Sequence, residues 1–304
     1  MPFLTQTYFS STPQNALMLL INELKISRSD AQRFIARGRL SQNGVIKENP
    51  FEMIIGEYNV VCFVPEPQGI KPLLVANDFA VYDKPSGLRV HPNNLENYYT
   101  LNDDIKHTFG SDANAAHRID QETSGLVLVS RHKNAEDILK QLFANRQITK
   151  HYLAMVRGEI KEVIDIQAPL YRNDHPNLKI SMEVKVDPRG KPSHTIITPL
   201  RYFPDFDMTL IKASPLTGRT HQIRVHLFHV EHPIIGDPVY GQKVEDIHRY
   251  IDREIKGQER IDKTGASRLL LHAQSLEFSY KEEKYIIESE SDFLSECFNS
   301  MQIG

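Results

Sequence analysis

The sequence predicts an α+β protein built on a mixed, largely antiparallel β-sheet flanked by helices, with a small α/β unit ahead of it. Seven strand-like segments follow residue 70, few helical patterns separate them, and strand and helix do not alternate regularly. The chain has 304 residues, of which 40% are hydrophobic and 25% charged, so roughly two domains with at least one sizeable core are expected.

The chain opens with the signals of two short helices and a hairpin. Apolar residues recur at helical spacing over residues 15–24, and residues 28–38 read as a second helix closed by a glycine. Residues 40–46 carry Asn-Gly between the short segments 40–42 and 45–46, which is typical of a tight hairpin, and residues 58–64 alternate as a strand. Two prolines and a glycine in residues 65–69 indicate a linker. We therefore expect two domains, 1–66 and 71–304.

In the second domain, few predicted helices separate the predicted strands. The strand-like segments are 79–82, 125–129, 152–156, 193–202, 208–212, 269–273 and 285–288. Helical spacing of apolar residues predicts an amphipathic helix over 134–145 and a second helix over 221–229.

Composition excludes several classes of protein. No run approaches the ~18 apolar residues that a membrane span needs, so no membrane partner is expected. The first residues show no basic leader before an apolar run, which indicates a cytoplasmic protein. Cys62 and Cys297 lie far apart and form no metal-ligand pair, so the sequence predicts neither a disulfide framework nor a zinc ribbon.

Basic residues cluster near the start of the chain although the formal net charge is −3. Between Lys25 and Lys47 there are six basic residues and one acidic residue, Asp30. Such a cluster is either a nucleic-acid-binding face or the solvated face of a helical hairpin. The candidate nucleic-acid contacts are Arg28, Arg33, Arg37 and Arg39.

Residues 117–129 carry the strongest chemical signal. A polar loop with Arg118 and Asp120 leads through Gly125 into an apolar strand, which places the carboxylate at the lip of a sheet. A structural ion pair between Arg and Asp gives the same pattern. Residues 215–227 add a tight turn and a helix start with two arginines and two histidines. Cations near a carboxylate lower its pKa, and an ionised carboxylate in a closed site can act as a nucleophile or base.

Residues 117–125, His-Arg-Ile-Asp-Gln-Glu-Thr-Ser-Gly, resemble the signature loop of the RluA-type pseudouridine synthases, which have their catalytic aspartate at the position of Asp120. Further similar motifs follow in the family's order at residues 83–92, 150–154, 218–227, 236–241 and 270–273. The resemblance covers residues from about 70 to 290. It implies a pseudouridine synthase fold and an RNA-modifying isomerase that needs no cofactor.

The resemblance also implies a role for each of several residues. Asp120 is the essential carboxylate, which attacks the sugar, attacks the base or removes a ribose proton. Arg118 is the base-flipping residue, because a stacked uridine must leave its helix to react. Tyr152 stacks on the flipped base, or is an ordinary core tyrosine. Arg224 pairs with the catalytic carboxylate, and Ile223 lines the uracil pocket.

Several further residues of the predicted site have two possible roles. Arg219 competes with Arg224 for the ion pair, and His117 is a further substrate-binding candidate. Lys84 and His91 either contact phosphate or cap loops. Gln121 departs from the basic residue usual in the family, which puts a phosphate contact at that position in doubt.

The histidines at positions 226, 229 and 232 have the spacing of one helical face, which is one requirement of a metal site. Catalytic metal sites also recruit carboxylates and supporting hydrogen bonds, so we predict no metal here. A metal-dependent hydrolase is accordingly a minor alternative. A catalytically silent RNA-binding or ribosome-assembly factor is the other, although Asp120 and Arg224 are both intact.

Residues 26–44 resemble an S4-like RNA-binding domain, through Ile-Ser-Arg-Ser-Asp-Ala-Gln at 26–32, Phe-Ile at 34–35, Gly-Arg-Leu at 38–40 and Asn-Gly at 43–44. The resemblance implies RNA as the partner of this unit. By analogy with two-domain members of the family, we expect a monomer acting on large-subunit ribosomal RNA, with transfer RNA as the alternative.

Overall fold

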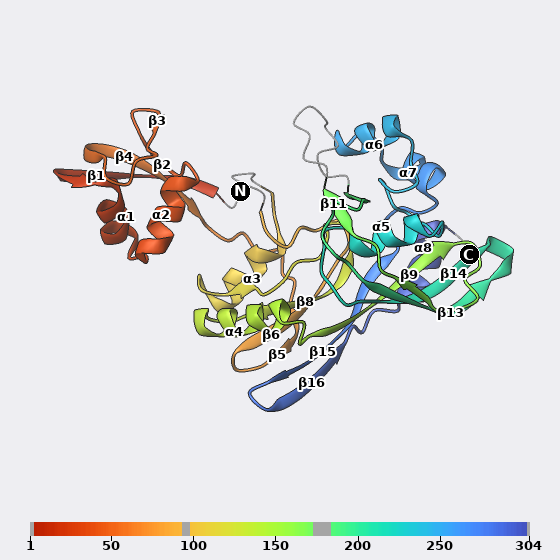
Figure 1. Ribbon diagram of the computed structural model, residues 1–304. Helices are drawn as coiled ribbons and strands as arrows, with labels where there is room; N and C mark the ends of the chain where they lie inside the picture. The colour runs from red at the N-terminus through yellow and green to blue at the C-terminus, as the bar shows by residue number, and fades with distance from the viewer. Residues whose placement is uncertain (1–2, 93–97, 173–183, 303–304) are drawn as a thin grey trace. The chain divides into compact units, whose positions relative to one another are not determined.

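The computed structural model of the protein describes residues 3–92, 98–172 and 184–302. It divides into two compact units (Figure 1). The first comprises Met1–Gly69 with His91–Thr108, and the second comprises Ile70–Val90 with Phe109–Gly304. Residues 91–108 therefore group with the first unit, which the sequence did not predict. Within the described residues, no helix combines the length and apolar character needed to cross a membrane.

The first unit is a four-stranded antiparallel sheet with two helices. Its strand order is β1 (Phe3–Asn15), β4 (Met53–Phe63), β2 (Leu40–Gln42) and β3 (Val45–Ile46). Helix α1 (Ala16–Leu24) begins at an Asn15 cap and α2 (Arg28–Ala36) at a Ser27 cap, which confirms the two predicted helices. Strand β1 was missed because its Thr-, Gln- and Ser-rich sequence is largely exposed and lacks the alternation that marks a half-buried strand.

The predicted linker is fixed by helix α3 (Leu101–Phe109). The backbone N–H of Glu66 donates to Asp103 at 3.1 Å, and that of Gly69 donates to Asp104 at 2.9 Å. Both carboxylates are buried, and buried acceptors of this kind are normally satisfied by such bonds. The segment 65–69 is thus held by hydrogen bonds, although its composition is that of a flexible connection.

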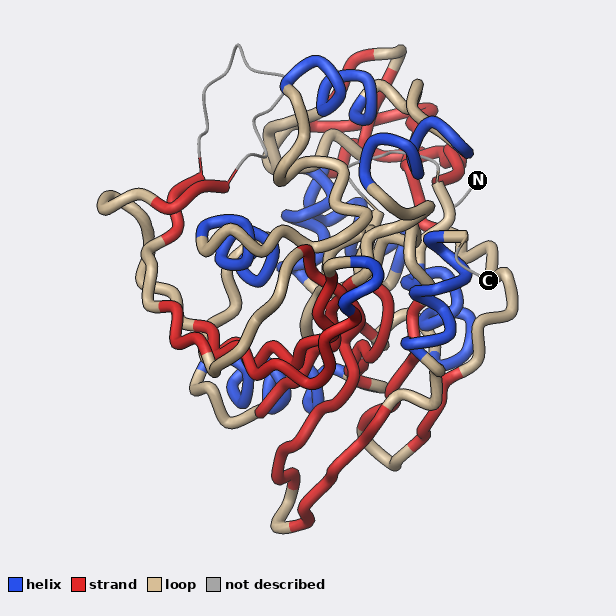
Figure 2. The backbone as a smooth tube through the Cα atoms, turned by 90° about the vertical axis from the view of Figure 1, so that its right-hand side faces the viewer, coloured by secondary structure: helices blue, strands red, loops and turns tan. Residues whose placement is uncertain are grey.

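The second unit is built on a ten-stranded sheet (Figures 1 and 2). Every adjacent pair of its strands is antiparallel except β8 and β15, which confirms the predicted mixed, largely antiparallel sheet. The main path of the sheet is β10 (Ile164–Ile166), β13 (Thr195–Phe203), β14 (Met208–Pro215), β9 (Thr149–Arg157), β15 (Leu271–Tyr280), β8 (Ser124–Ser130), β6 (Phe79–Lys84) and β5 (Pro72–Val75).

Short elements extend this sheet. Strand β16 (Glu283–Glu288) forms with β15 a hairpin that projects at the bottom of Figures 1 and 2, and β7 (Asn114–Ala115) pairs with β8. A separate pair consists of β11 (Leu170–Arg172) and β12 (Val184–Val186).

Five helices and one 3₁₀ turn accompany the described strands of this unit. Helix α4 (Lys133–Ala144) and helix α5 (Gln222–His229) confirm the two predicted helices. The others are the 3₁₀ turn η1 (Pro204–Phe206), α6 (Val244–Ile251), α7 (Gly257–Thr264) and α8 (Phe293–Met301). Helix α7 was not predicted because it is short and mostly polar, whereas α6 carries apolar residues at helical spacing, Val244, Ile247 and Ile251, and was overlooked.

The parallel pairing of β8 and β15 positions the loop that precedes β8. Gly125 lies opposite Ala273, and a Cβ atom at Gly125 would lie 2.4 Å from the Ala273 carbonyl oxygen, so only glycine fits. On the other side of β15, Tyr152 also lies opposite Ala273. The end of the loop that carries Asp120 and the strand that carries Tyr152 therefore flank Ala273 in the sheet.

Candidate active site

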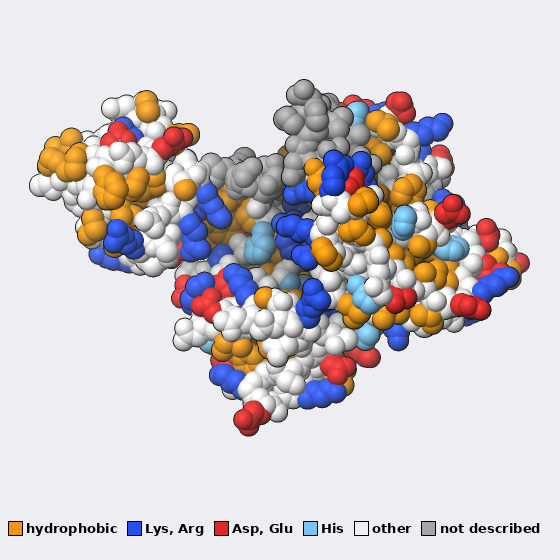
Figure 3. All heavy atoms as spheres, viewed as in Figure 1, with side chains coloured by type: hydrophobic (Ala, Val, Ile, Leu, Met, Phe, Trp, Pro, Cys, Tyr) orange, Lys and Arg blue, Asp and Glu red, His pale blue; other side chains and the backbone are white. Residues whose placement is uncertain are grey.

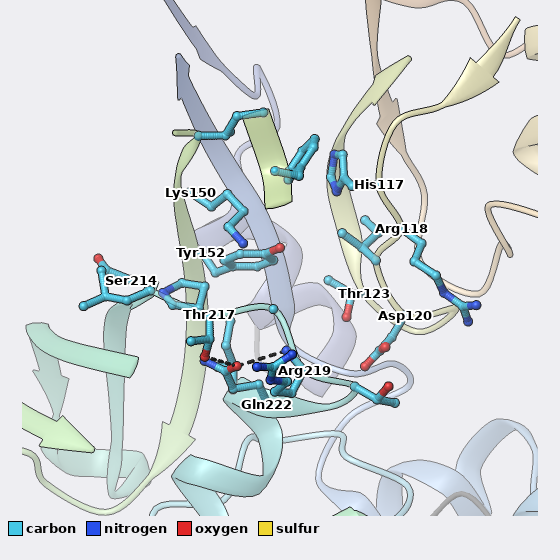
Figure 4. A pocket seen from close by; sticks show the side chains of 18 of the residues that line it. His117, Arg118, Asp120, Thr123, Lys150, Tyr152, Ser214, Thr217, Arg219 and Gln222 are labelled. Atoms are coloured by element: carbon cyan, nitrogen blue, oxygen red, sulfur yellow. Dashed lines mark hydrogen bonds between the residues drawn. The ribbon is translucent and has the colours of Figure 1, made fainter. Parts of the chain in front are cut away.

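A cavity of about 840 Å³ opens in the second unit where loop 117–123, strand β9 and the segment 214–224 meet (Figure 4). It is lined by most of the site residues predicted from the sequence, which are His117, Arg118, Asp120, Tyr152, Arg219, Ile223 and Arg224. The structure thus brings together residues that are more than 100 positions apart in the chain. Lys84 is not among the lining residues.

Asp120 presents its carboxylate to this cavity, with 27% of its side chain exposed. Its Oδ2 atom accepts a hydrogen bond from Arg224 Nη1 at 3.3 Å and lies 3.8 Å from His221 Nε2. Burial by itself would raise the pKa of Asp120, but the positive charges of His221, when protonated, and of Arg224 outweigh it and hold the pKa below its usual value. The carboxylate is therefore ionised at neutral pH.

Burial, the largest influence on His221, lowers the pKa of this imidazole to about 4. The imidazole is consequently neutral at pH 7, and Arg224 is the cation that acts on Asp120 there. His221 Nδ1 lies 2.9 Å from the Tyr240 hydroxyl, which fixes the ring beside the carboxylate.

Arg224 is held rigidly behind Asp120. It is only 4% exposed, and its Nε and Nη2 atoms donate to the two oxygens of Asp237 at 2.7 and 2.8 Å. Burial opposes the charge on Arg224, but the carboxylate of Asp237 outweighs burial and raises the pKa of the guanidinium. The bidentate pair leaves Nη1 for Asp120, so Asp237 orients the arginine that contacts the candidate catalytic group.

Asp237 is a functional residue that the sequence does not predict, since residues 236–241 show only a similarity to a family motif. Asp237 also shapes a turn, because it accepts the backbone N–H groups of Val239 and Tyr240 at 2.8 and 3.0 Å. The available signal was its place in the motif at 236–241, but nothing in the sequence paired it with Arg224.

Tyr152 lies on β9 with its ring in the cavity, as Figure 4 shows. Burial and the nearby charge of Asp120 raise the pKa of its phenol, so the hydroxyl keeps its proton. Ile223 is buried at the start of α5 and adds an apolar contact surface to the same cavity. Together they provide a flat ring and an aliphatic side chain beside an ionised carboxylate.

His117 and Arg118 occupy different environments although they are neighbours. His117 Nε2 accepts the backbone N–H of Leu128 at 3.0 Å, and its ring lies 4.5 Å from that of Phe143. Burial lowers the pKa of His117 to about 3, so it is neutral and braces the loop against β8. Arg118 is exposed, and Figure 4 shows its side chain extending away from Tyr152.

The structure distinguishes the two candidates for the ion pair. Arg219 is exposed and donates from Nε to the Pro192 carbonyl at 3.3 Å, whereas Arg224 bonds to Asp120. Gln222 fixes this turn by accepting the backbone N–H of Arg219 at 3.0 Å and the Thr217 hydroxyl at 2.6 Å.

Lys84 is completely buried, so the alternative of a phosphate contact does not fit its position. Its ammonium donates to the carbonyls of Pro85 and Gln121 at 2.9 and 3.2 Å. Burial lowers its pKa to about 7. Lys84 thus acts as a loop cap that fixes the backbone directly after Asp120, while the Gln121 side chain is bonded to Arg89 at 2.9 Å.

Glu122 ties the loop to helices α6 and α7, a contact that the sequence did not indicate. Its two carboxylate oxygens accept the Tyr250 hydroxyl at 2.8 Å and Arg260 Nη2 at 2.5 Å. The ion pair is largely buried, with 13% of the Glu122 side chain and 14% of the Arg260 side chain exposed. The contacts of His117 before Asp120 and of Glu122 after it therefore hold this loop in place.

The histidines at the end of α5 have separate partners. His226 is buried, with Nδ1 2.9 Å from the Thr195 hydroxyl and Nε2 3.0 Å from the Ala168 carbonyl. His232 Nδ1 lies 2.8 Å from the Arg157 carbonyl. Across residues 3–92, 98–172 and 184–302, no group of His, Cys, Asp or Glu side chains is arranged to hold a metal ion.

The four arginines singled out in the first unit are not equivalent. Arg39 is half-buried and its guanidinium lies over the rings of Phe3 and Phe34, at 4.8 and 5.2 Å from their centroids. Arg33 pairs with Asp30. Arg28 and Arg37 are exposed, and these two are the most available for an external anion.

Comparisons with known proteins agree with this geometry. Residues 78–229 match a family model described as RNA pseudouridylate synthase. An uncharacterized RNA pseudouridine synthase of Helicobacter pylori (strain J99) is 37% identical over 289 residues, which span 95% of this chain and 96% of that protein. The ribosomal large subunit pseudouridine synthase C of Buchnera aphidicola is 34% identical over 210 residues, 68% of this chain and 62% of that protein. The solved structure of human RNA pseudouridylate synthase domain containing 1 has a TM-score of 0.57 and 26% identity, and the match covers 76% of this chain and 89% of that structure.

Proposed function

This chain belongs to the RluA-type family of RNA pseudouridine synthases, which are isomerases, and on that premise we propose that it modifies uridines of large-subunit ribosomal RNA with Asp120 as its reacting carboxylate. The observation that carries the proposal is the ionised Asp120 at the cavity surface, bonded to an arginine that Asp237 holds in place. The ribosomal target is supported by the Buchnera aphidicola relative, a ribosomal large subunit pseudouridine synthase C.

The proposed reaction needs only groups that the cavity contains. The bond between uracil N1 and ribose C1′ breaks, the base turns, C5 bonds to C1′, and the C5 proton is lost while N1 gains one. Asp120 supplies the nucleophile or base, and Arg224 keeps it negative. Tyr152 and Ile223 hold the base, and the exposed Arg118 enters the helix from which the uridine has been extruded.

The target is tested by mapping pseudouridines in ribosomal and transfer RNA from cells with and without the protein. We expect one or a few positions in large-subunit ribosomal RNA to lose modification, and to regain it with the wild-type chain but not with Asp120→Asn. Loss confined to transfer RNA would overturn the ribosomal assignment, and an unchanged map in both RNAs would overturn the proposed function.

The first unit is proposed to be an S4-like RNA-binding domain that uses Arg28 and Arg37. Replacing both by Gln should raise the Kd for the substrate RNA about tenfold and reduce the slope of log K against log salt by about 1.5, because each lost phosphate contact removes 0.7–0.9 of slope. The turnover rate at saturating RNA should not change. Filter binding at several salt concentrations measures both quantities.

The matched control removes two exposed charges from the second unit, by Lys161→Gln with Lys284→Gln. It should leave the affinity and the salt slope near wild type. Equal effects of the two double variants would mean that only the overall charge matters, and the RNA-binding role of the first unit would be abandoned.

A further inference from the structure

The cavity holds a lysine that none of the roles described above uses. Lys150 lies on β9 two residues before Tyr152, so the two side chains share a face of the strand. Figure 4 shows its ammonium in the cavity, next to the ring of Tyr152. Within residues 3–92, 98–172 and 184–302, this ammonium has no hydrogen-bond or ion-pair partner.

Lys150 is partly buried, and a partly buried cation without a counter-charge is less stable than one paired with a carboxylate. Burial lowers the pKa of Lys150, and no carboxylate offsets it. The described residues that line the cavity include five Lys or Arg side chains and a single carboxylate, that of Asp120, which is already bonded to Arg224. The cavity therefore lacks negative charge at the position of Lys150.

The opposite wall leaves this ammonium uncovered. A Cβ atom at Gly218 would lie 3.7 Å from Lys150 Nζ, so any side chain longer than alanine at that position would approach the ammonium. Gly218 does not have a positive φ, so its lack of a side chain is not a requirement of the backbone there. The consequence of glycine at 218 is an open path between Lys150 and the cavity.

Resting on the proposed function, we propose that the Lys150 ammonium binds a phosphodiester group of the substrate RNA next to the extruded uridine. A compact ammonium suits a phosphate oxygen, and each nucleotide that enters the cavity brings a charged phosphate on either side of it. Lys and Arg side chains also gather near the centre of the view in Figure 3, and such positive charge attracts the phosphates of a nucleic acid strand.

The test combines the Lys150→Met variant with chemically altered RNA. The probe is a stem-loop containing the mapped uridine, either unmodified or with one neutral methylphosphonate 5′ or 3′ of that uridine. Affinity is measured in the Asp120→Asn background, so that binding is read without turnover. Turnover of the unmodified stem-loop by the wild-type protein is measured separately, and its absence would count against the proposed function and not against the phosphate contact.

With Lys150 present, one of the two methylphosphonates should raise Kd about tenfold, because a hydrogen bond to a charged group is lost. Lys150→Met should raise Kd for the unmodified RNA about as much, and the same methylphosphonate should then have no further effect. Lys150→Arg should recover part of the affinity, and the control Lys284→Met, which removes an exposed charge outside the cavity, should behave as wild type.

Two results would overturn the inference. One is an equal methylphosphonate penalty with and without Lys150. The other is an unchanged Kd with a lower turnover rate in Lys150→Met, which would place the ammonium on the uracil instead of on a phosphate. The thermal midpoint provides a check on folding, because removing an unpaired, partly buried ammonium should leave the midpoint unchanged or raise it, whereas a structural role would lower it.

Discussion

Asp120→Asn is expected to abolish pseudouridine formation, lowering the turnover rate by at least about 10⁴-fold, the usual loss when an essential reacting group is removed. The amide has nearly the volume of the carboxylate but carries no negative charge, so it is neither a base nor a competent nucleophile. The measurement is release of tritium from uridine C5 in labelled substrate RNA, which reports the loss of the C5 proton.

The same variant should fold and bind RNA almost normally. The Asp120 side chain is 27% exposed and has one hydrogen bond to Arg224 at 3.3 Å, and an amide oxygen can still accept it. Arg224 keeps its stronger contacts with Asp237. The free energy of unfolding should therefore change by less than about 1 kcal/mol.

The control is Asp137→Asn, which makes the same chemical change on an exposed position of α4 and should leave activity intact. Measurable turnover by Asp120→Asn would refute the assignment of this carboxylate. An inactive variant that has also lost its cooperative unfolding would report a folding defect, and the RNA affinity separates the two cases.

The parts of the site that could be predicted are those encoded in short, contiguous segments. Loop 117–125 contains both Asp120 and Gly125, the glycine that the parallel pairing with Ala273 requires. Nine contiguous residues therefore indicate both the reacting carboxylate and its place at the end of a strand. The turn before α5 likewise predicts a cation near a carboxylate. The structure adds which of two arginines makes the contact, and this depends on the direction of α5, which residue spacing alone does not fix.

The parts that could not be predicted involve partners distant in the chain. Glu122 meets Arg260, 138 residues away, which lies in α7, a helix too polar to be recognised from periodicity. Lys84 has the residue type of a phosphate ligand, but its complete burial is a property of the assembled sheet. The strands were easier to predict, because buried β-rich runs such as β8 are apolar throughout, whereas the polar strand β1 carries no such signal.

Asp237→Asn is expected to destabilise the protein by about 3 kcal/mol, because it removes one charge of a buried pair and leaves the other. Asp237 is 1% exposed and Arg224 is 4% exposed, so water cannot replace the lost interaction. An asparagine also has one acceptor oxygen for the two donors of Arg224, and the guanidinium would no longer be held in one orientation toward Asp120.

The turnover rate of Asp237→Asn should consequently fall about 10–100-fold, the usual cost of losing a group that orients a reacting one, with little change in KM. Urea unfolding and steady-state kinetics measure the two effects. The control Glu277→Gln breaks an exposed pair with Lys284 by the same carboxylate-to-amide change and should cost less than about 1 kcal/mol. If both variants lost equal stability and kept full activity, Asp237 would be only a turn residue, and Arg224 would hold its position through the remaining packing of α5.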